Sequence, residues 1–517
     1  MELNGSAREI AARVAADVRG REARRTPTAP GEAPDGWCAR VRDGGPALLA
    51  LLVVAAVLRI VALNQQLWLD ETLLLADYVR QPVTKSATAY PNDNNHPLYS
   101  LAASLSARVC GEEAWALRLP AVLFGLASLA ALYALARRFL PRGAAWCAAA
   151  AAAVSYHHVF FSQNARGYTA LFFFTLLSTD AFLRARDGER RAPLVQALAL
   201  GFGAWSHLTG VFVGLGQAAA QLLAPGRGGR FVRGPWAGIL GGGAVTLLLH
   251  APMARDLWTF FAGRDDRAAT ASEWTNPLSQ LRAAAEGFGV GGTAAAVVAG
   301  ALGLSVGAAG LGALWLRDRG AALAFTLPGM LGGAATLALG RHLWPRFFFF
   351  CAGFALIVLV AGLRTWIAIL AGRRAAAATR GLAATLLVAS AATVPSAWRP
   401  KQDFVGAVAA AARGDVDAPR GEVFAAGLAM WPCKHLYAPR FTPLALGDGD
   451  KPLDDDAPLR AALARNRAET RVLTCSPVFL RSRTPKIAAL LEAECVEEAR
   501  FRGTMGRELD LVVLRPR

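Results

Sequence analysis

One stretch of the sequence limits the folds open to this chain more than any other. Residues 287–316 contain no charged side chain. A helix needs roughly 20 mainly apolar residues to cross the hydrocarbon core of a bilayer, where each backbone polar group must be satisfied within the helix. This run is long enough, so the sequence predicts an integral membrane protein built from helices.

Ten further apolar stretches have about the length of a membrane-spanning helix. They cover residues 46–63, 118–136, 144–161, 167–183, 193–208, 209–224, 235–253, 321–340, 346–370 and 381–397. Hydrophobic residues make up 54% of the chain and charged residues only 18%, whereas a soluble protein is charged at about a quarter of its positions. The sequence therefore predicts an all-α polytopic membrane protein with about eleven transmembrane helices.

The distribution of arginine predicts the orientation of these helices. If residues 1–45 form a cytosolic basic tail, every loop predicted to be cytosolic contains several Arg, as the positive-inside bias requires. These residues are Arg137, Arg138, Arg142, Arg184, Arg186, Arg190, Arg191, Arg227, Arg230, Arg233, Arg317, Arg319, Arg373, Arg374 and Arg380. An odd number of spans then places residues 398–517 outside the cytosol. We expect a multi-pass protein of the inner (plasma) membrane.

The net charge of +17 raises the question of a nucleic-acid partner. The charge lies in short clusters between apolar runs, which suits a membrane surface better than a nucleic-acid groove. Residues 1–45 are polar and the first apolar run begins only near Pro46, so they do not form a signal peptide. We expect membrane lipid as a partner and no nucleic acid.

The pattern changes after the predicted transmembrane domain, which covers residues 46–397. Short apolar runs alternate with helical stretches, which predicts a small extracytoplasmic α/β domain over residues 398–517. The runs are 423–426, 471–474 and 509–514, and the helical stretches are 403–413, 457–466 and 485–494. Cys433, Cys475 and Cys495 lie in this domain. The sequence does not choose a disulfide pair among them.

Two adjacent acids follow the first predicted span. Residues 67–72 read Leu-Trp-Leu-Asp-Glu-Thr, which places Asp70 and Glu71 in the long outside loop 64–117. A carboxylate held in a partly dry cleft can act as general base on an acceptor hydroxyl. Acids also favour an ordinary helix start through the helix dipole. Residue type alone leaves both interpretations open.

Further polar residues lie in the predicted outside loops. Asp93 and His96 belong to the segment 90–99, where His96 could bind a phosphate or a metal or could cap a turn. The short link 162–168 reads Ser-Gln-Asn-Ala-Arg-Gly-Tyr, and its Arg166 lies at the predicted outer membrane edge. A guanidinium there can grip a phosphate through two hydrogen bonds or extend toward lipid headgroups. Arg346 offers another cation at the same level.

These segments, in this order, resemble a known family. An LW-x-DE sequence is followed by His-Pro-Leu-Tyr at 96–99, by Ala-Trp-Ala-Leu-Arg-Leu-Pro at 114–120, and by the link 162–168. This order resembles the GT-C glycosyltransferases of family 39, the group of protein mannosyltransferases and aminoarabinose transferases. The bacterial dolichyl-phosphate-mannose-transferase-like and RgtA/B/C/D-like members are especially similar. The resemblance covers residues 46–185 most closely and extends loosely to about 400.

The resemblance implies a polytopic GT-C fold and a reaction on the extracytoplasmic face. A sugar would move from a polyprenyl-phosphate donor to a hydroxyl of a glycan, lipid or protein acceptor, with inversion at the anomeric carbon. Asp70 matches the family's catalytic acid, and Glu71 would orient the acceptor or shape the site. Arg166 would stabilise the departing phosphate, with Tyr168 bracing it.

The resemblance also assigns lesser roles and shows two departures. Asp93 and His96 fall on the family's His-Pro segment and are substrate-binding candidates. Arg346 is a further donor-phosphate candidate on its charge and predicted position alone, outside the resemblance. Asn164 stands where many members carry an acid, and Leu98 replaces a second Pro. We therefore treat Asn164 as a substrate-binding candidate, and we expect the change from an acid to alter the specificity of the enzyme.

Two other functions remain open from the residues alone. A transporter or flippase would place charged groups near the bilayer midplane, where only Arg59 is a candidate in the outer part of the first span. An O-antigen ligase-like enzyme would use a later outside loop, here 254–286. No metal site is predicted, because the spacing of Asp70, Glu71 and His96 fits no strong ligand pattern. A shared divalent cation is left open, and no other cofactor is expected.

Overall fold

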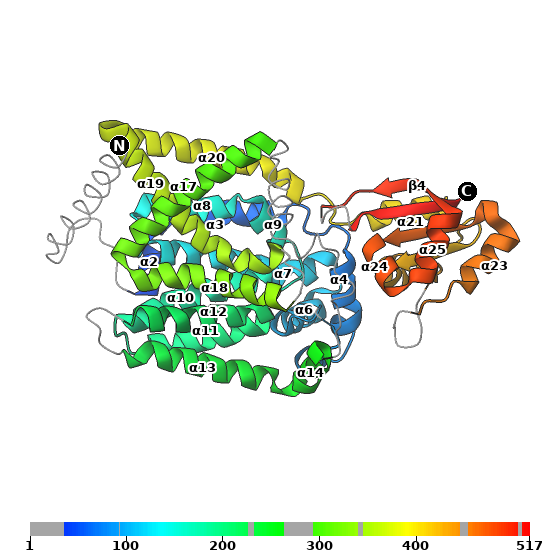
Figure 1. The fold of residues 1–517 in the computed structure, drawn as a ribbon, viewed down its shortest axis with the longest axis horizontal. Helices are drawn as coiled ribbons and strands as arrows, with labels where there is room; N and C mark the ends of the chain where they lie inside the picture. Colours follow the sequence, from blue (N-terminus) through cyan, green and yellow to red (C-terminus); the bar gives the residue numbers. More distant parts are fainter. Residues whose placement is uncertain are drawn as a thin grey trace.

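The computed structural model describes residues 36–92, 94–225, 232–262, 293–339, 345–444, 453–504 and 509–517. They form a bundle of long helices with a smaller, sheet-containing unit at one end (Figure 1). Several features named above lie outside the described residues: most of the basic tail, Asp93, Arg227, Arg230 and most of the loop 254–286.

The bundle is built from the apolar stretches that the sequence indicates. Its helices are α2 (Trp37–Asp43), α3 (Gly45–Ile60), α6 (Pro97–Cys110), α7 (Ala114–Ala136), α8 (Arg142–Ala153), α9 (Tyr156–Ser162), α10 (Tyr168–Arg186), α11 (Ala192–Ser206), α12 (Val211–Leu223), α13 (Arg233–His250), α14 (Ala254–Ala262), α17 (Thr293–Arg317), α18 (Arg319–Ala338), α19 (Ala352–Ala371) and α20 (Ala375–Ala397), with short turns η2 (Leu208–Gly210), η4 (Ala251–Met253), η6 (Pro345–Cys351) and η7 (Gly372–Arg374). Each of the predicted membrane stretches overlaps at least one of these helices.

The predicted number of spans is not confirmed. Among the described residues, six helices are long and apolar enough to cross a membrane, or up to seven if the bent pair α2 and α3 forms one span. Helices α11 and α12 are short, and the stretch 144–161 is broken between α8 and α9 at Val154 and Ser155. A sequence window that counts apolar residues does not detect such breaks, because the residues within them are themselves apolar or small.

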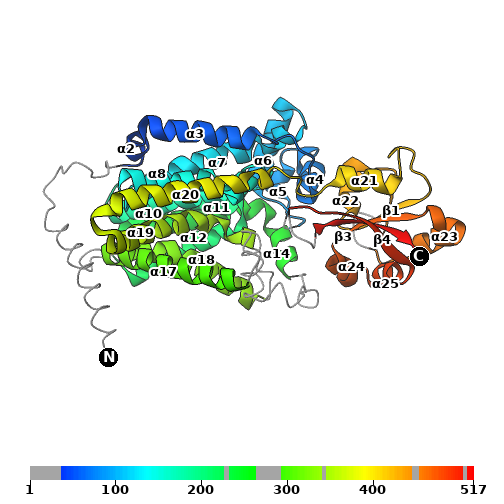
Figure 2. The ribbon, with the colours of Figure 1, turned by 90° about the horizontal axis from the view of Figure 1, so that it is seen from above.

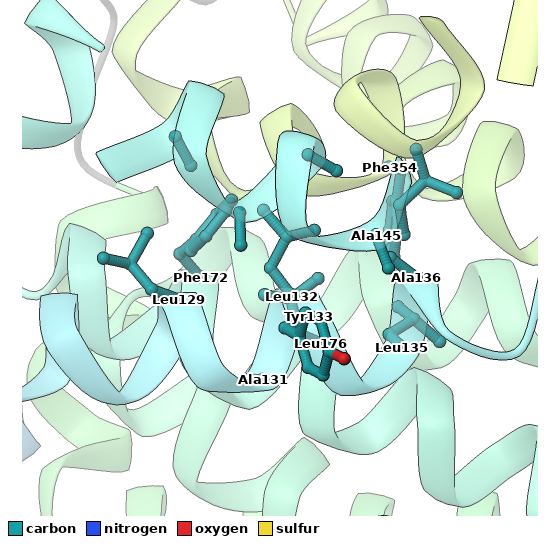
Figure 3. Packing of buried hydrophobic residues seen from close by; sticks show 14 of the residues in the cluster. Leu129, Ala131, Leu132, Tyr133, Leu135, Ala136, Ala145, Phe172, Leu176 and Phe354 are labelled. Atoms are coloured by element: carbon teal, nitrogen blue, oxygen red, sulfur yellow. The ribbon is translucent and has the colours of Figure 1, made fainter. Parts of the chain in front are cut away.

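Helix α7 lies at the centre of the packing. Its residues Leu132 and Tyr133 have no exposed surface, and they pack with Phe172 and Leu176 of α10 and with Phe354 of α19 (Figure 3). These contacts join the early motif-bearing helices to the late helices of the chain. The helices that carry the site described below therefore share one buried hydrophobic core.

Helices α17 and α19 approach each other at two glycines. A Cβ atom added at Gly310 would lie 1.9 Å from the carbonyl oxygen of Val358, and one added at Gly362 would lie 1.9 Å from that of Val306. Close backbone contact through small residues is a common way for helices to associate in lipid, where apolar burial alone does not drive association.

A buried ionic cluster fixes the end of the bundle away from the sheet. Helix α2 bends by 85° from α3. Its Arg40 contacts the carboxylate of Asp180 at 2.5 Å, and Arg184 binds the same carboxylate at 2.8 Å. Because Asp180 is fully buried, this pairing ties α2 to α10.

The C-terminal unit contains a five-stranded sheet in the order β2-β1-β3-β5-β4. Strand β1 is parallel to β2 and β3, and β5 is antiparallel to β3 and β4. The strands are β1 (Val423–Gly427), β2 (Thr442–Pro443), β3 (Arg471–Cys475), β4 (Cys495–Phe501) and β5 (Leu511–Pro516), and the helices are α21 (Phe404–Ala412), α22 (Met430–Pro432), η8 (Cys433–Tyr437), α23 (Ala457–Asn466), η10 (Arg467–Glu469), α24 (Pro477–Arg483) and α25 (Pro485–Glu494). The predicted combination of strands and helices is confirmed.

Two features of this unit were not evident from the sequence. Strand β4 is an edge strand whose outward residues are charged, so it lacks the apolar alternation that marks a half-buried strand. Its three cysteines, Cys433, Cys475 and Cys495, are buried, and no disulfide joins any two of them.

The first outside loop lies between the bundle and the C-terminal unit (Figure 2). It forms α4 (Leu69–Leu74), the π-helical turn η1 (Leu75–Val79) and α5 (Lys85–Thr88). Both Figure 1 and Figure 2 place α4 and the sheet at the end of the bundle opposite α2. The two predicted outside regions thus share one end of the molecule.

Candidate active site

Asp70 and Arg166 meet at this end of the bundle. Asp70 is the second residue of α4, and Arg166 lies in the link between α9 and α10. The Nη2 atom of Arg166 is 3.6 Å from the Oδ2 atom of Asp70, and the two side chains are 6% and 17% exposed. The sequence-predicted carboxylate and guanidinium, 96 positions apart in the chain, therefore form an ion pair with the carboxylate as its more accessible member.

Asn94 holds the two members of this pair together. Its side-chain oxygen and its carbonyl oxygen both accept hydrogen bonds from Nη1 of Arg166, and its Nδ2 donates to the carbonyl oxygen of Asp70 at 3.1 Å. Asn94 is buried. Its neighbour Asp93, the residue singled out from the sequence, lies outside the described residues.

Glu71 points away from Asp70 into a closed ion pair. Its Oε2 lies 2.5 Å from Nη2 of Arg118 and its Oε1 accepts from Nε of Arg118 at 2.8 Å. Oε1 also accepts from the backbone N–H of Ala165 at 2.8 Å, and Oε2 accepts from that of Trp68 at 3.4 Å. The Glu71 side chain has no exposed surface. This carboxylate joins α4, α7 and the link 162–168 and is fully occupied in doing so.

The electrostatics of Glu71 follow from these contacts. Burial acts to raise the pKa of its carboxyl, but the charges of Arg118 and Lys401 and the hydrogen bonds to Arg118 and Ala165 outweigh burial, so the pKa lies below its ordinary value. Arg118 in turn donates to the carbonyl oxygens of Leu63, Gln65 and Gln66. The pair is thus ionised and fixes the backbone that leads into α4.

The link 162–168 is anchored along its length. Ser162 Oγ accepts a hydrogen bond from Nε of Arg59 at 3.1 Å, and Gln163 Nε2 donates to the carbonyl oxygen of Arg59 at 2.9 Å. Asn164 Oδ1 accepts from the indole N–H of Trp68 at 3.1 Å. Asn164 therefore braces the turn before α4, while its Nδ2 is buried without a partner among the described residues.

Gly167 allows the link to pass close to its neighbours. A Cβ atom at this position would lie 2.0 Å from the carbonyl oxygen of Ser206 and 3.1 Å from Nδ1 of His96. No other residue fits without moving the backbone, so the glycine in this motif has a steric reason.

A cluster of aromatic rings lies next to Arg166. The rings of His96 and His207 are 4.7 Å apart, and Tyr168 lies 5.7 Å from His96 and 5.4 Å from His207. Phe347 extends the cluster, 5.5 Å from His207, and the guanidinium of Arg346 lies over its ring at 5.8 Å. The predicted residues His96, Arg166, Tyr168 and Arg346 thus gather in one place.

The Nδ1 atoms of the two histidines in the cluster have different hydrogen-bond partners. Burial lowers the pKa of His96 well below its ordinary value, and the charge of Arg166 acts in the same direction. Nδ1 of His96 faces the carbonyl oxygen of Ser206 at 2.9 Å and therefore carries the proton. Nδ1 of His207 accepts from the backbone N–H of Thr209 at 3.2 Å, so its proton is on Nε2.

Two polar atoms of the cluster are left over. Nε2 of His96 and the hydroxyl of Tyr168 are buried without a hydrogen-bond partner among the residues that the structure describes. Buried polar groups are nearly always paired in native proteins. Their state indicates that this cluster is built to meet a polar ligand.

Over the described ranges, no group of three or more His, Cys, Asp and Glu side chains is arranged to hold a metal ion. Asp70, Glu71 and His96, the three groups considered from the sequence, have separate contacts: Asp70 with Arg166, Glu71 with Arg118 and His96 with Ser206.

Sequence reasoning missed several members of the site. Arg118 lies within the motif 114–120 but was not singled out, because an Arg at a span entrance is ordinarily interfacial. Asn94 and His207 carried no signal of their own beyond their polarity next to apolar helices. Gln402 contacts α4 from a segment more than 300 positions away, and no local pattern reveals such a contact.

Comparisons with known proteins find one similar sequence family and several similar folds. The sequence model of the family described as dolichyl-phosphate-mannose-protein mannosyltransferase matches residues 93–255. That range holds Arg118, Arg166 and the aromatic residues up to His207, and it covers less than half of the chain. The search of curated proteins gives no match.

Solved structures are similar over most of the chain. ArnT from Cupriavidus metallidurans in the apo state is 14% identical with a TM-score of 0.53, over 91% of this chain and 98% of that one. The same protein bound to undecaprenyl phosphate gives 13% and 0.52, over 90% and 98%. The Archaeoglobus fulgidus oligosaccharyltransferase in complex with Zn and sulfate gives 12% and 0.52, over 88% and 72%. At these identities the likeness shows a shared fold.

Proposed function

We propose that this chain, a multi-pass membrane protein with the GT-C fold and similar to family 39, transfers a sugar from a polyprenyl-phosphate donor to an acceptor hydroxyl. The observation that carries the proposal is the meeting of Asp70 and Arg166, 3.6 Å apart at one end of the bundle. One group can take a proton and the other can bind a phosphate, as transfer from a lipid phosphate requires.

Asp70 is the general base of the proposed reaction. Its carboxylate takes the proton of the acceptor hydroxyl while the hydroxyl oxygen forms a bond to the anomeric carbon. The bond between that carbon and the phosphate oxygen breaks, and the polyprenyl phosphate leaves with the electron pair from the opposite side. The anomeric centre inverts. A positioned base of this kind contributes about 10²–10⁴ in rate.

Arg166 and the aromatic cluster receive the donor phosphate. The guanidinium of Arg166 is held by Asn94, so its charge is oriented before the ligand arrives. The Nε2–H of His207, the hydroxyl of Tyr168 and the guanidinium of Arg346 add donors or positive charge beside it. Fixed donors aimed at developing negative charge stabilise the transition state without reorganisation. His96 presents an acceptor at Nε2, which suits a sugar hydroxyl.

Glu71 acts by positioning rather than by contact with substrate in this proposal. Its four hydrogen bonds leave it no free oxygen for an acceptor. Asn164 shares this role, because its oxygen braces Trp68. The Nδ2 of Asn164, which has no partner among the described residues, is proposed to donate to the acceptor.

The reaction is proposed to take place on the extracytoplasmic face, with the N-terminus cytosolic. Supporting this, α4 and the C-terminal sheet lie at the end of the bundle away from α2 (Figure 2). The loops at the α2 end are the Arg-rich ones, and basic loops stay in the cytosol. ArnT of Cupriavidus metallidurans has been solved with undecaprenyl phosphate, which supports a donor of the same class here.

The contacts of Arg59 do not support the transporter alternative. Its guanidinium donates to the carbonyl oxygens of Ala55 and Ala153 and contacts Ser162 and His158. These bonds make Arg59 a brace between helices rather than a lining of a substrate path. The loop that a ligase-like enzyme would use lies largely outside the described residues.

The test replaces Asp70 by Asn in protein reconstituted into vesicles with a panel of labelled polyprenyl-phosphate sugars. We expect transfer to fall by at least about 10², with insertion and thermal stability close to wild type. The matched control is Glu112→Gln, an exposed acid of the same loop paired with Arg80, which should transfer normally. Unchanged transfer by Asp70→Asn would reject Asp70 as the base.

A further inference from the structure

The segment that leads into the C-terminal unit contacts the turn before α4 and the first residue of that helix. Oε1 of Gln402 accepts a hydrogen bond from the backbone N–H of Leu69 at 3.0 Å. Oδ1 of Asp403 accepts from Nε2 of Gln66 at 2.9 Å, and Oε1 of Gln66 accepts from the N–H of Val405 at 2.9 Å. The turn just before Asp70 is therefore hydrogen-bonded to the C-terminal unit both at its beginning, through Gln66, and at its end, through Leu69.

Tyr437 adds a fourth bond from the same unit. Its hydroxyl donates to the carbonyl oxygen of Leu67 at 2.6 Å, and its ring stacks on Phe404 with centroids 5.2 Å apart. Phe404 has no exposed surface and belongs to the core of the sheet unit. The contact is thus connected to the folded interior of the C-terminal unit.

Lys401 connects the same segment to the link that carries Arg166. Its Nζ donates to the carbonyl oxygen of Gln163 at 2.7 Å and lies 5.2 Å from the centroid of the Phe160 ring. Lys401 is buried. Two neighbouring residues of one segment therefore contact both chain segments that supply the proposed catalytic pair.

We infer that residues 401–405, defined here as the strap, are a positioning element that sets the distance between Asp70 and Arg166. The inference rests on the proposed function for its catalytic meaning. Lys401, Gln402 and Asp403 touch neither substrate nor reacting atoms; they act through α4 and the link 162–168. The C-terminal unit is accordingly part of the catalytic apparatus and not an independent appendage.

Gln402 is the residue of the strap that contacts α4 directly. Leu69 is the first residue of α4, and the first N–H groups of a helix have no partner within it. Gln402 supplies that partner from 333 positions away. Its own Nε2 is held by the carbonyl oxygen of Leu509 at 3.0 Å. The side-chain amide of Gln402 is thereby held by the C-terminal unit, and it holds the first residue of α4 in turn. We infer that it sets the position of Asp70, the next residue.

The experiment compares Gln402→Met, which keeps the length of the side chain but removes its acceptor, with Gln402→Glu, which restores an acceptor for the Leu69 N–H. The control is Lys486→Met, a substitution to the same residue at an exposed position of α25 that is distant in the sequence from the strap. Two readouts are taken on the full-length protein in vesicles: steady-state transfer, and hydrogen exchange of the peptide covering residues 66–75.

We expect Gln402→Met to speed exchange of that peptide and to lower kcat by about tenfold to a hundredfold, with little change in KM for the donor. Gln402→Glu should recover most of both. Unchanged exchange in Gln402→Met, or faster exchange without a fall in kcat, would overturn the inference. If the wild type transfers none of the sugars, the proposed function fails, and the exchange result alone still decides whether the strap holds α4.

Discussion

Replacing Glu71 by Ala separates positioning from catalysis at the two adjacent acids. The change removes the anion that faces Arg118 and leaves a guanidinium that is 1% exposed without its charge partner. It also leaves the N–H groups of Ala165 and Trp68 without their acceptor. Removing one member of a buried ion pair costs about 3–5 kcal/mol, because the remaining charge is uncompensated. We expect a loss of stability of this order.

The assay is thermal unfolding of the purified protein in detergent, followed beside the transfer rate. Glu71→Ala should unfold at a clearly lower temperature and lose transfer, whereas Glu112→Ala removes an exposed pair in the same loop and should cost no more than about 1 kcal/mol. The double variant Glu71→Leu with Arg118→Met should recover stability relative to Glu71→Ala, since no charge is left buried. If Glu71→Ala keeps wild-type stability and loses only transfer, Glu71 acts on substrate and the positioning role is wrong.

The same residue predicts a dependence on pH. The pKa of Glu71 in the folded protein lies below its ordinary value of 4.5, so the folded state binds a proton there less readily than the unfolded state. The stabilisation it gives is fully present above the ordinary pKa and is lost as the pH falls through the lower, folded pKa. Unfolding measured from neutral to acidic pH should show this loss in the wild type and a smaller one in Glu71→Gln.

Two further predictions concern glycines. Gly167→Ala should reduce transfer strongly, because its Cβ would meet the carbonyl oxygen of Ser206 at 2.0 Å and push the link that carries the proposed phosphate ligand; an active Gly167→Ala enzyme would show that the link moves freely. Gly310→Val should destabilise the packing of α17 on α19, because a Cβ at this position would lie 1.9 Å from the carbonyl oxygen of Val358. The control is Gly312→Val on the same helix, where an added Cβ has no neighbour within 4 Å. Equal melting temperatures for these two variants would contradict the close approach of the helices.

The sequence was informative about the helices and about which residues gather at the site. Apolar run length identified the stretches that form the bundle, because the bilayer demands one kind of structure from any long uncharged segment. It did not reveal the break between α8 and α9, because Val154 and Ser155 are compatible with an apolar helix by composition. The break there depends on tertiary contacts, including the hydrogen bond that the Val154 carbonyl accepts from Ser390.

Residue type and spacing could not predict the different contacts of the two acids; only the family resemblance distinguished Asp70 from Glu71. Asp70 and Glu71 are adjacent and chemically alike, and successive residues on a helix point about 100° apart. Which of them pairs with Arg118 depends on where the tertiary fold places the entrance of α7 relative to α4. The same holds for Gln402, whose only clue is its place in a polar segment directly after the last long helix.

The order and spacing of the motifs have a single physical explanation. The start of α4 is held by Glu71 within its own segment, by Arg118 at the entrance of α7, by Asn164 in the link, and by Gln402 on the C-terminal unit. Each brace comes from a different part of the chain, so none can be replaced by a local adjustment. Under the proposed function, the position of Asp70 must be fixed before the lipid-borne donor arrives. Hydrogen bonds from several distant segments fix it, which explains why the motifs that supply them occur together.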